Sequence, residues 1–349
     1  MLRKAITIMA CMVVLGISLL SAKIWTVDSN QGNSAADFKT FQAAHDGAAS
    51  GDTLYFSGSS VNYGNCTLTK KLTVIGPGYY LSSNTDLQAN PAAATVSHVT
   101  FNGGSQGSIM MGMTVTGLLR IDTNNITIKR NRLYYDTNYP TIDIRYSTGT
   151  ISNIILAQNI IFLNSTSTST SAKVIDIADN CTGIFIVNNY INTGHSDVQY
   201  QYSIYANASN TDVQVINNTI RGQVYLGDLG TFNNNILRAG AFSASKIIPR
   251  NNLADTTQFG TANGNQENVD MATVFDSTKT TSDSRWMLDP ASPAKGAGLN
   301  GEDLGMYGGM SPYVLSGIPP VPSIYHFTAP VSGSKAQGLP VRIKIRSNK

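Results

Sequence analysis

Residues 126–133 read Ile-Thr-Ile-Lys-Arg-Asn-Arg-Leu, an alternating apolar run that ends in the unit Asn-x-Leu. The unit Asn-x-Ile or Asn-x-Leu returns six times between Ile126 and Leu253. Its asparagines are Asn131, Asn159, Asn189, Asn218, Asn234 and Asn251. Their spacings of 28, 30, 29, 16 and 17 residues fit a coil of constant core length in which some turns carry extra loops. Such a repeat predicts a solenoid, in which each turn packs on its neighbours.

Apolar residues alternate five and three positions before the first four asparagines. They are Ile126/Ile128, Ile154/Leu156, Ile184/Ile186 and Val213/Val215. This alternation predicts a strand with one buried face, followed by a bend at the asparagine and a second strand. A buried amide needs hydrogen-bond partners, and an identical amide one turn away, roughly 4.8 Å along the axis, would supply them. We therefore predict an asparagine ladder.

A third strand follows a loop of variable length in each turn. The segments are 141–146, 174–178, 202–206 and 223–226. Three strands per turn predict an all-β fold, a right-handed parallel β-helix, the hand being a general property of this architecture. We divide the chain into a signal peptide (residues 1–22), a β-helix domain with an N-terminal cap (23–309) and a C-terminal β-strand tail (310–349).

The first 22 residues have the pattern of a secretory signal peptide. Arg3 and Lys4 precede an apolar run from Ala5 to Leu20, and Ser21-Ala22 is suited to cleavage. The run is short for a spanning helix, so we expect no stable membrane insertion after its removal. Without Arg3 and Lys4 the chain is nearly neutral, which argues against nucleic-acid binding. We expect a secreted, extracellular or cell-surface monomer, with the periplasm as an alternative location.

Two cysteines remain after this segment, Cys66 and Cys181. The repeat places them several turns apart, beyond the reach of a disulfide, for which Cα atoms must lie within roughly 7 Å. We expect them to be small buried apolar residues, and the sequence gives no support for a zinc site.

Residues 36–49 have helical spacing, with Phe38, Phe41 and Ala44 on one side, and predict a helix that covers the open first coil. Gly51-Asp-Thr-Leu54 and Lys71-Leu-Thr-Val-Ile-Gly76 follow. This arrangement resembles the opening coil of the pectate-lyase-like β-helix superfamily. Residues 286–298, which include Ser292-Pro-Ala294, and Asp303-Leu-Gly-Met-Tyr-Gly-Gly309 resemble the closing segment of secreted bacterial β-helix repeat proteins. These motifs are structural, and the resemblance implies a scaffold without naming a catalytic residue.

The tail beyond Gly309 contains a stiff segment, Pro319-Pro-Val-Pro322, and two expected strands at 323–327 and 339–345. Two interpretations remain open for it: a β-hairpin that caps the last coil, or a small attachment module. Lys129, Arg130 and Arg132 lie near the asparagine bend, and we expect them to face solvent.

Three consecutive turns carry their extra residues between the second and third strands, at 134–140, 164–172 and 192–201. Insertions on one side of a solenoid often border a binding face. In the superfamily that the chain resembles, loops at this point border the groove that holds an extended polysaccharide. Alternation predicts that the outward residues of the third strands form its floor. These are Asp143, Arg145, Asp176, Ser203, Tyr205 and Tyr225, with Arg120 and Asp122 one coil earlier.

Asp143 and Asp176 would lie about 5 Å apart on neighbouring strands and could share a proton or a cation, which would suit acid–base chemistry with Arg145 beside them. Tyr135, Tyr139, Tyr200, Tyr202, Tyr205 and Tyr225 offer flat faces for sugar rings, and His195, the one histidine of these loops, offers a further polar contact. The alternative is a face of solvated charges that pair across coils. We predict no metal ligands and no cofactor, because the dense Asp cluster of the superfamily's calcium-dependent lyases is missing; Ca²⁺ remains the only ion to consider.

Three functions remain open. The first is a secreted or surface-exposed protein that binds an extended polysaccharide. The second is a polysaccharide lyase or glycoside hydrolase with Asp143, Arg145 and Asp176 as its catalytic residues. The third is a structural or adhesive surface protein, attached through residues 310–349.

Overall fold

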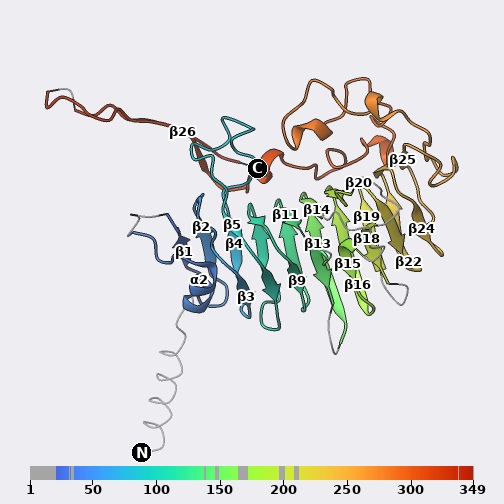
Figure 1. Cartoon of the computed structure of the whole chain (residues 1–349), viewed down its shortest axis with the longest axis horizontal. Helices are drawn as coiled ribbons and strands as arrows, with labels where there is room; N and C mark the ends of the chain where they lie inside the picture. Colours follow the sequence, from blue (N-terminus) through green and yellow to red (C-terminus); the bar gives the residue numbers. More distant parts are fainter. Residues whose placement is uncertain are drawn as a thin grey trace, which may run out of the picture.

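A computed structural model describes residues 21–30, 32, 35–136, 139–145, 149–163, 172–195, 201–207, 212–336 and 338–348. The chain winds as a right-handed parallel β-helix, and its strands stack into three long parallel sheets (Figure 1). The predicted signal peptide lies almost wholly outside the described residues. Among the residues described, no helix has the length and apolar character needed to span a bilayer.

Between Thr73 and Ala244 each turn contributes one strand to each sheet, in the order that the repeat predicts. Sheet A contains β1 (Ile24–Val27), β2 (Thr53–Phe56), β4 (Thr73–Ile75), β7 (Ile109–Met111), β10 (Ile126–Lys129), β13 (Ile151–Ala157), β16 (Cys181–Val187), β19 (Asp212–Ile216) and β22 (Leu229–Asn233). Sheet C, formed by the second strands, contains β5 (Thr95–Val96), β8 (Thr114–Val115), β11 (Arg132–Tyr135), β14 (Ile160–Leu163), β17 (Tyr190–Asn192), β20 (Thr219–Arg221), β23 (Ile236–Arg238) and β25 (Leu253–Ala254). Sheet B, formed by the third strands, contains β3 (Cys66–Leu68), β6 (Val99–Phe101), β9 (Leu119–Ile121), β12 (Ile142–Ile144), β15 (Ala172–Ile177), β18 (Gln201–Ala206), β21 (Gln223–Leu226) and β24 (Phe242–Ala244).

The remaining elements lie at the two ends of the chain. They are helix α2 (Phe41–Gly47), the short 3-10 helices η2 (Met271–Thr273), η3 (Ser284–Trp286), η4 (Leu299–Gly301) and η5 (Leu315–Gly317), and the antiparallel hairpin β26 (Ser323–Thr328) and β27 (Arg342–Arg346).

Apolar residues of like position stack from coil to coil and form the core. Ile126 pairs with Ile154, and Ile154 with Ile184, all fully buried. Cys66 and Cys181 are buried and free, on β3 and β16. Burial raises the pKa of the Cys181 thiol to about 12, so it is neutral at physiological pH.

The asparagine ladder is present and is longer than predicted. The backbone N–H and side-chain amide of Asn159 both donate to Oδ1 of Asn189, at 2.9 and 3.0 Å. Asn189 donates in turn to Asn218. Asn265 adds a further step by accepting the N–H of Asn252. The repeat did not reveal Asn265, because Glu267 stands where the unit has Ile or Leu.

The prediction was wrong by one residue in the two short turns. The ladder members there are Asn235 and Asn252, not Asn234 and Asn251. Leu237 points into the core as Ile220 does, whereas Ile236 lies on the outside of sheet C. In each of these turns two asparagines are adjacent, and the residue two positions after either one is apolar. The sequence therefore fits a ladder position at either asparagine.

The residue before each ladder asparagine has a left-handed backbone conformation. These residues are Arg130, Gln158, Asn188, Asn217, Asn234 and Asn251, with φ between 51° and 58°. The conformation is costly for residues other than glycine, although asparagine tolerates it better than most. It directs their side chains outward, where they meet another part of the chain.

That part is residues 294–318, which we call the strap. The strap runs back along the β-helix, from the last coils toward the first (Figure 1). Asn251 donates to the carbonyl of Ala297 and Asn217 to that of Asp303. The same side-chain position bonds further strap carbonyls in earlier coils: Asn188 with Gly308, Gln158 with Pro312 and Arg130 with Ile318. Expecting Arg130 to face solvent was therefore wrong, because its guanidinium is buried under the strap.

The N-terminal cap differs in its boundaries. Helix α2 begins at Phe41, after Thr40, whose hydroxyl accepts the N–H of Ala43. Phe38 is not in the helix but forms a β-bridge with Val27 of β1. Strand β1, which the pattern did not reveal, is the end strand of sheet A, and Trp25 anchors it by donating to Asp52 at 2.8 Å.

The hairpin lies beside the early coils, so the interpretation that it caps the last coil is wrong. The N–H of Ala89 donates to the carbonyl of Ile324, and Arg346 donates to the carbonyl of Leu87. The strap explains this position, because it carries the chain back along the β-helix before the hairpin begins (Figure 1).

Candidate functional site

The outer face of sheet B carries a row of polar and aromatic residues in strict register. Arg120 of β9 pairs with Asp143 of β12, and Asp143 with Asp176 of β15. Asp176 pairs with Tyr205 of β18, and Tyr205 with Tyr225 of β21. Parallel pairing at these positions therefore brings together residues that lie far apart in the sequence.

Arg145 joins the two acidic residues. Its Nε donates to Asp143 and its Nη2 donates to Asp176 Oδ2 at 2.9 Å. Lys173 forms a second ion pair with Asp176, at 2.9 Å to Oδ1. One coil earlier, Arg120 pairs with Asp122 at 2.9 Å. The carboxylates of Asp143 and Asp176 thus share one cationic group, the guanidinium of Arg145 on the same face.

Asp143 and Asp176 are nearly buried, with 5% and 8% of their surfaces exposed. Burial raises the pKa of Asp143, and the charge of Asp176 adds to the rise, whereas the hydrogen bond from Arg145 opposes it. Arg145 is more open, with 42% of its side chain exposed. A ligand that approaches this cluster meets the arginine first.

The tyrosines continue the row beyond Asp176. The rings of Tyr205 and Tyr225 stack with centroids 5.0 Å apart and an angle of 18°. Tyr202 meets Tyr205 edge to face at 5.1 Å, and the Lys173 ammonium lies 3.9 Å from the Tyr205 centroid. These half-buried rings form an apolar patch next to the charged cluster.

Other predicted residues lie elsewhere. Ser203 is fully buried, contrary to expectation, because a register shift between Tyr202 and Ile204 turns it inward, and its hydroxyl donates to the carbonyl of Arg221. Tyr135 is half-buried against the ring of His98, and Tyr139 is 68% exposed.

Two predicted residues remain to be placed. His195 lies toward sheet C, where its carbonyl accepts from Arg221. Tyr200 lies outside the described residues, as do most residues of the loops that were expected to form a wall. Among the described residues, no three His, Cys, Asp or Glu side chains come together as metal ligands.

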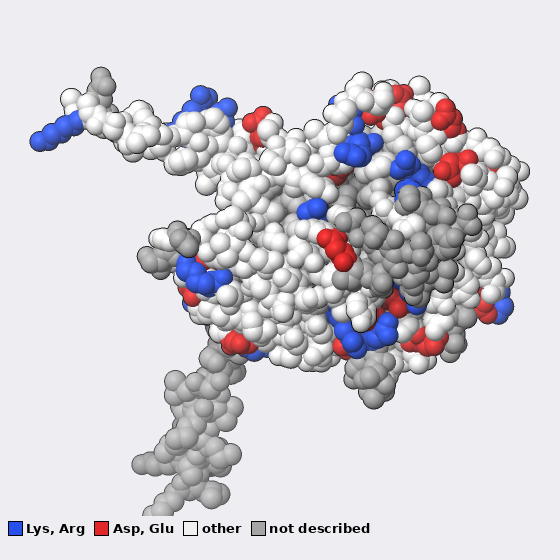
Figure 2. Space-filling view, in the orientation of Figure 1, with Lys and Arg blue, Asp and Glu red and all other residues white. Residues whose placement is uncertain are grey.

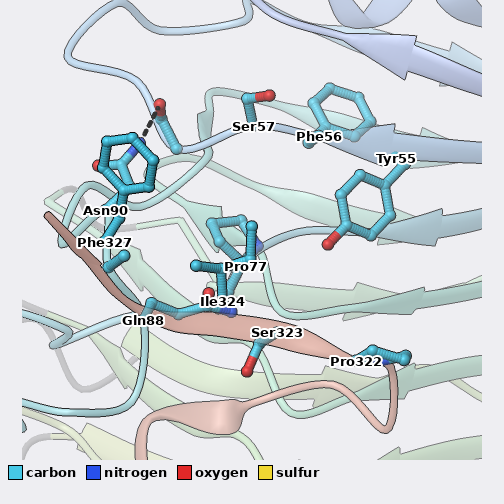
Figure 3. A pocket seen from close by; sticks show the side chains of 12 residues that line it. Tyr55, Phe56, Ser57, Pro77, Gln88, Asn90, Pro322, Ser323, Ile324 and Phe327 are labelled. Atoms are coloured by element: carbon cyan, nitrogen blue, oxygen red, sulfur yellow. Dashed lines mark hydrogen bonds between the residues drawn. The ribbon is translucent and has the colours of Figure 1, made fainter. Parts of the chain in front are cut away.

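The sequence did not indicate a cavity of about 580 Å³ between the early coils and the hairpin. Figure 3 shows Tyr55 and Phe56 on one side and Ile324 and Phe327 of β26 on the other. Asn90 closes one end by donating to the carbonyl of Gly58 at 3.1 Å. Because no side chain of its lining carries a charge at neutral pH, this cavity offers packing and amide contacts but no acid–base group.

Sheet C has an outer face that the sequence also left unassigned. Arg132, expected in solvent, is half-buried with its guanidinium 4.3 Å from the ring centroid of Tyr134. Lys129 is half-buried too, and burial lowers its pKa. The third residue after each ladder asparagine lies on this face, as Tyr134 and Phe162 do. Comparing that position from coil to coil would have revealed the row from the sequence.

Comparisons with known proteins agree with the architecture. No protein-family model matches the chain, and no curated protein matches its sequence. The chain is similar to the crystal structure of pectate lyase Pel9A, with a TM-score of 0.51 and 14% identity over 82% of this chain and 96% of that chain. At this identity the likeness establishes the fold alone: the chain is a right-handed parallel β-helix.

Proposed function

We propose that this is a secreted or surface-exposed protein that binds an extended polysaccharide along the outer face of sheet B. The in-register row from Arg120 to Tyr225 carries the proposal. Its residues repeat at the coil spacing, about 4.8 Å, which is close to the length of one sugar residue in an extended chain. The row therefore offers one contact for each sugar.

Its two halves suit different parts of a glycan. Tyr205 and Tyr225 form a stacked aromatic pair, and the parts of these rings that remain uncovered give the C–H groups of a sugar an apolar surface to pack on. Arg145 and Lys173 provide donors for hydroxyl or acidic groups. The fold supports the proposal in a general way, because the similar solved structure is that of a pectate lyase.

A catalytic role for Asp143 and Asp176 is the second candidate. Burial favours a proton on Asp143, and a neighbouring ionised carboxylate would complete a lyase or hydrolase pair. Against this, Arg145 and Lys173 already neutralise both carboxylates. We therefore favour binding over catalysis.

One experiment addresses both candidates. The chain from Lys23 onward is mixed with a panel of plant, algal and host glycans, with and without Ca²⁺, and both affinity and product size are measured. We expect saturable binding to one class and a loss of roughly 10- to 30-fold in Tyr205→Ala and Tyr225→Ala. The matched control, Tyr325→Ala on the hairpin, keeps full affinity.

The same assay separates the outcomes. Products that shorten in the wild type and stay long in Asp143→Ala and Asp176→Ala would establish catalysis. Affinity that is unchanged in both tyrosine variants would overturn the assignment of the glycan site to sheet B.

A further inference from the structure

The outer face of sheet C carries a second in-register row that the glycan proposal does not use. The row consists of Tyr134, Phe162, Asn192, Arg221 and Arg238, one from each of five successive strands. It differs from the sheet B row in its charge, since it contains arginines and no acidic residue.

A cavity of about 310 Å³ lies over the middle of this row. Its floor is formed by Phe162, Tyr190 and Asn192 of β14 and β17. Its walls come from distant parts of the chain, Tyr80 on one side and Arg285 with Trp286 of η3 on the other. The volume is in the range of small-ligand sites and suits one or two sugar rings.

Phe162, Tyr190 and Trp286 line the cavity, and Tyr134 lies beside Phe162 outside the lining. Tyr134 and Phe162 stack with centroids 5.2 Å apart and only 5° between their planes. Tyr190 and Trp286 stack at 4.5 Å and 17°. Such flat pairs are the surfaces on which the apolar face of a sugar ring packs.

Four guanidinium groups lie near these rings, and one of them, Arg285, belongs to the cavity lining. Arg132 lies 4.3 Å from the Tyr134 centroid, and Arg238 lies 4.6 Å from the Trp286 ring. Arg285 lines the cavity and is exposed. The charges of Arg221, Arg238 and Arg285 all act on the Tyr190 hydroxyl, although burial is the larger influence and raises its pKa to about 12. On the face seen in Figure 2, basic and acidic side chains both lie where the C-terminal segment meets the strands.

Little negative charge offsets these arginines. The ion pairs of the described residues include none of Arg132, Arg238 and Arg285. The Nε of Arg238 is buried without a hydrogen-bond partner. Asp283 lines the cavity, but its carboxylate accepts from Asn84, Tyr313 and Ser316 within the strap region. An anion would therefore find donors here that are not already taken.

We propose that this cleft binds a sugar ring carrying a carboxylate or sulfate group, with the ring packed against the aromatic floor and the anion held by Arg285, while the nearby charge of Arg238 adds to the attraction. Arginine suits this task because its planar donors match both anions and because it stacks on aromatic faces. The site is independent of the sheet B proposal, since it lies on another sheet and uses none of the same residues.

Tryptophan fluorescence tests the site directly. The chain has two tryptophans, and Trp25 lies on β1, so Trp25→Phe leaves Trp286 as the only reporter. Titration with uronate oligosaccharides, sulfated oligosaccharides and neutral oligosaccharides of the same length should give a saturable change with one or both acidic classes only. Which acidic class binds identifies the anion. Calorimetry on the unaltered chain checks the affinity without any substitution.

Substitution then locates the contact. We expect Arg285→Gln and Arg238→Gln each to weaken acidic-sugar binding at least tenfold, whereas Arg342→Gln on the hairpin, the matched control, leaves it unchanged. Tyr205→Ala should also leave it unchanged, because it tests the other face. Absence of saturable binding to every acidic sugar, equal binding of the neutral series, or full affinity in both cleft variants would overturn the proposal.

Discussion

The amide of a single ladder asparagine takes part in more hydrogen bonds in this chain than it would in an isolated turn. Asn189 donates to Leu156, Val187 and Asn218 and accepts two hydrogen bonds from Asn159. All of these atoms lie where water cannot replace the lost partner, because the ladder is fully buried. Each unpaired group then costs about 1–3 kcal/mol.

We expect Asn189→Ala to lower the free energy of unfolding by about 3–5 kcal/mol, measured by urea denaturation. The control is Asn207→Ala, whose amide contacts Asp179 at the surface and whose loss should cost about 0.5 kcal/mol or less. Equal effects of the two substitutions would contradict the ladder's role in stability.

At this scale the sequence predicted residue types better than register. The repeat identified four ladder positions correctly and placed Asp143 beside Asp176, because stacked strands preserve position from coil to coil. It failed at Asn234 and Asn251, where adjacent asparagines allow two registers, and at Ser203, where a shift in strand pairing turns the side chain inward. Both failures are changes of a single residue, which reverse the inside and outside of a strand.

Among the elements, the hairpin β26–β27 has two unlike faces. Ile324, Phe327, Ile343 and Ile345 lie on one face and are 44–64% exposed. Arg342, Lys344 and Arg346 occupy the other. An exposed apolar face of this kind marks an interaction surface, which agrees with the hypothesis of an attachment module.

Deleting residues 323–349 tests that hypothesis. The melting temperature should fall by only a few degrees, because few contacts join the hairpin to the coils. Retention on the surface of the producing cell, measured by fractionation, should be lost. Full retention of the shortened chain would reject the attachment role, and a large fall in melting temperature would assign the hairpin to the β-helix itself.

The strap is the element that the sequence did not predict. Its own residues have no strand or helix pattern, and its partners are left-handed residues scattered over six coils. Nothing in one coil's sequence indicates that a segment 46 to 188 residues away will bond to it. For the same reason the cleft on sheet C was not predicted, since η3 supplies one of its walls.

For the whole molecule, the strap joins parts that a solenoid usually keeps independent. Its far end is held by a buried network in which Tyr313 donates to Asp283 and contacts Tyr79, while Asn84 donates to the same carboxylate. In a simple repeat protein each coil interacts only with its neighbours. Here residues near Asn84 and residues near Asn251 depend on the same segment.

We expect Tyr313→Phe to cost about 1–3 kcal/mol and to loosen both regions together. Hydrogen exchange should speed up in residues 79–84 and in the strap as far as Ala297, while the central strands β13 to β19 keep their protection. Tyr55→Phe, on the outer face of sheet A, is the control and should change neither. Loosening at only one end would show that the strap does not couple them.

The side chains of the residues with left-handed backbone relate the length of the strap to the number of coils. Between Ala297 and Ile318 it meets Asn251, Asn234, Asn217, Asn188, Gln158 and Arg130 in turn, so a set stretch of strap belongs to each coil. Repeat proteins commonly change length by gaining or losing whole repeats. In this molecule such a change would leave the strap too short or too long for the coils. The number of coils can therefore vary only if the length of the strap changes with it.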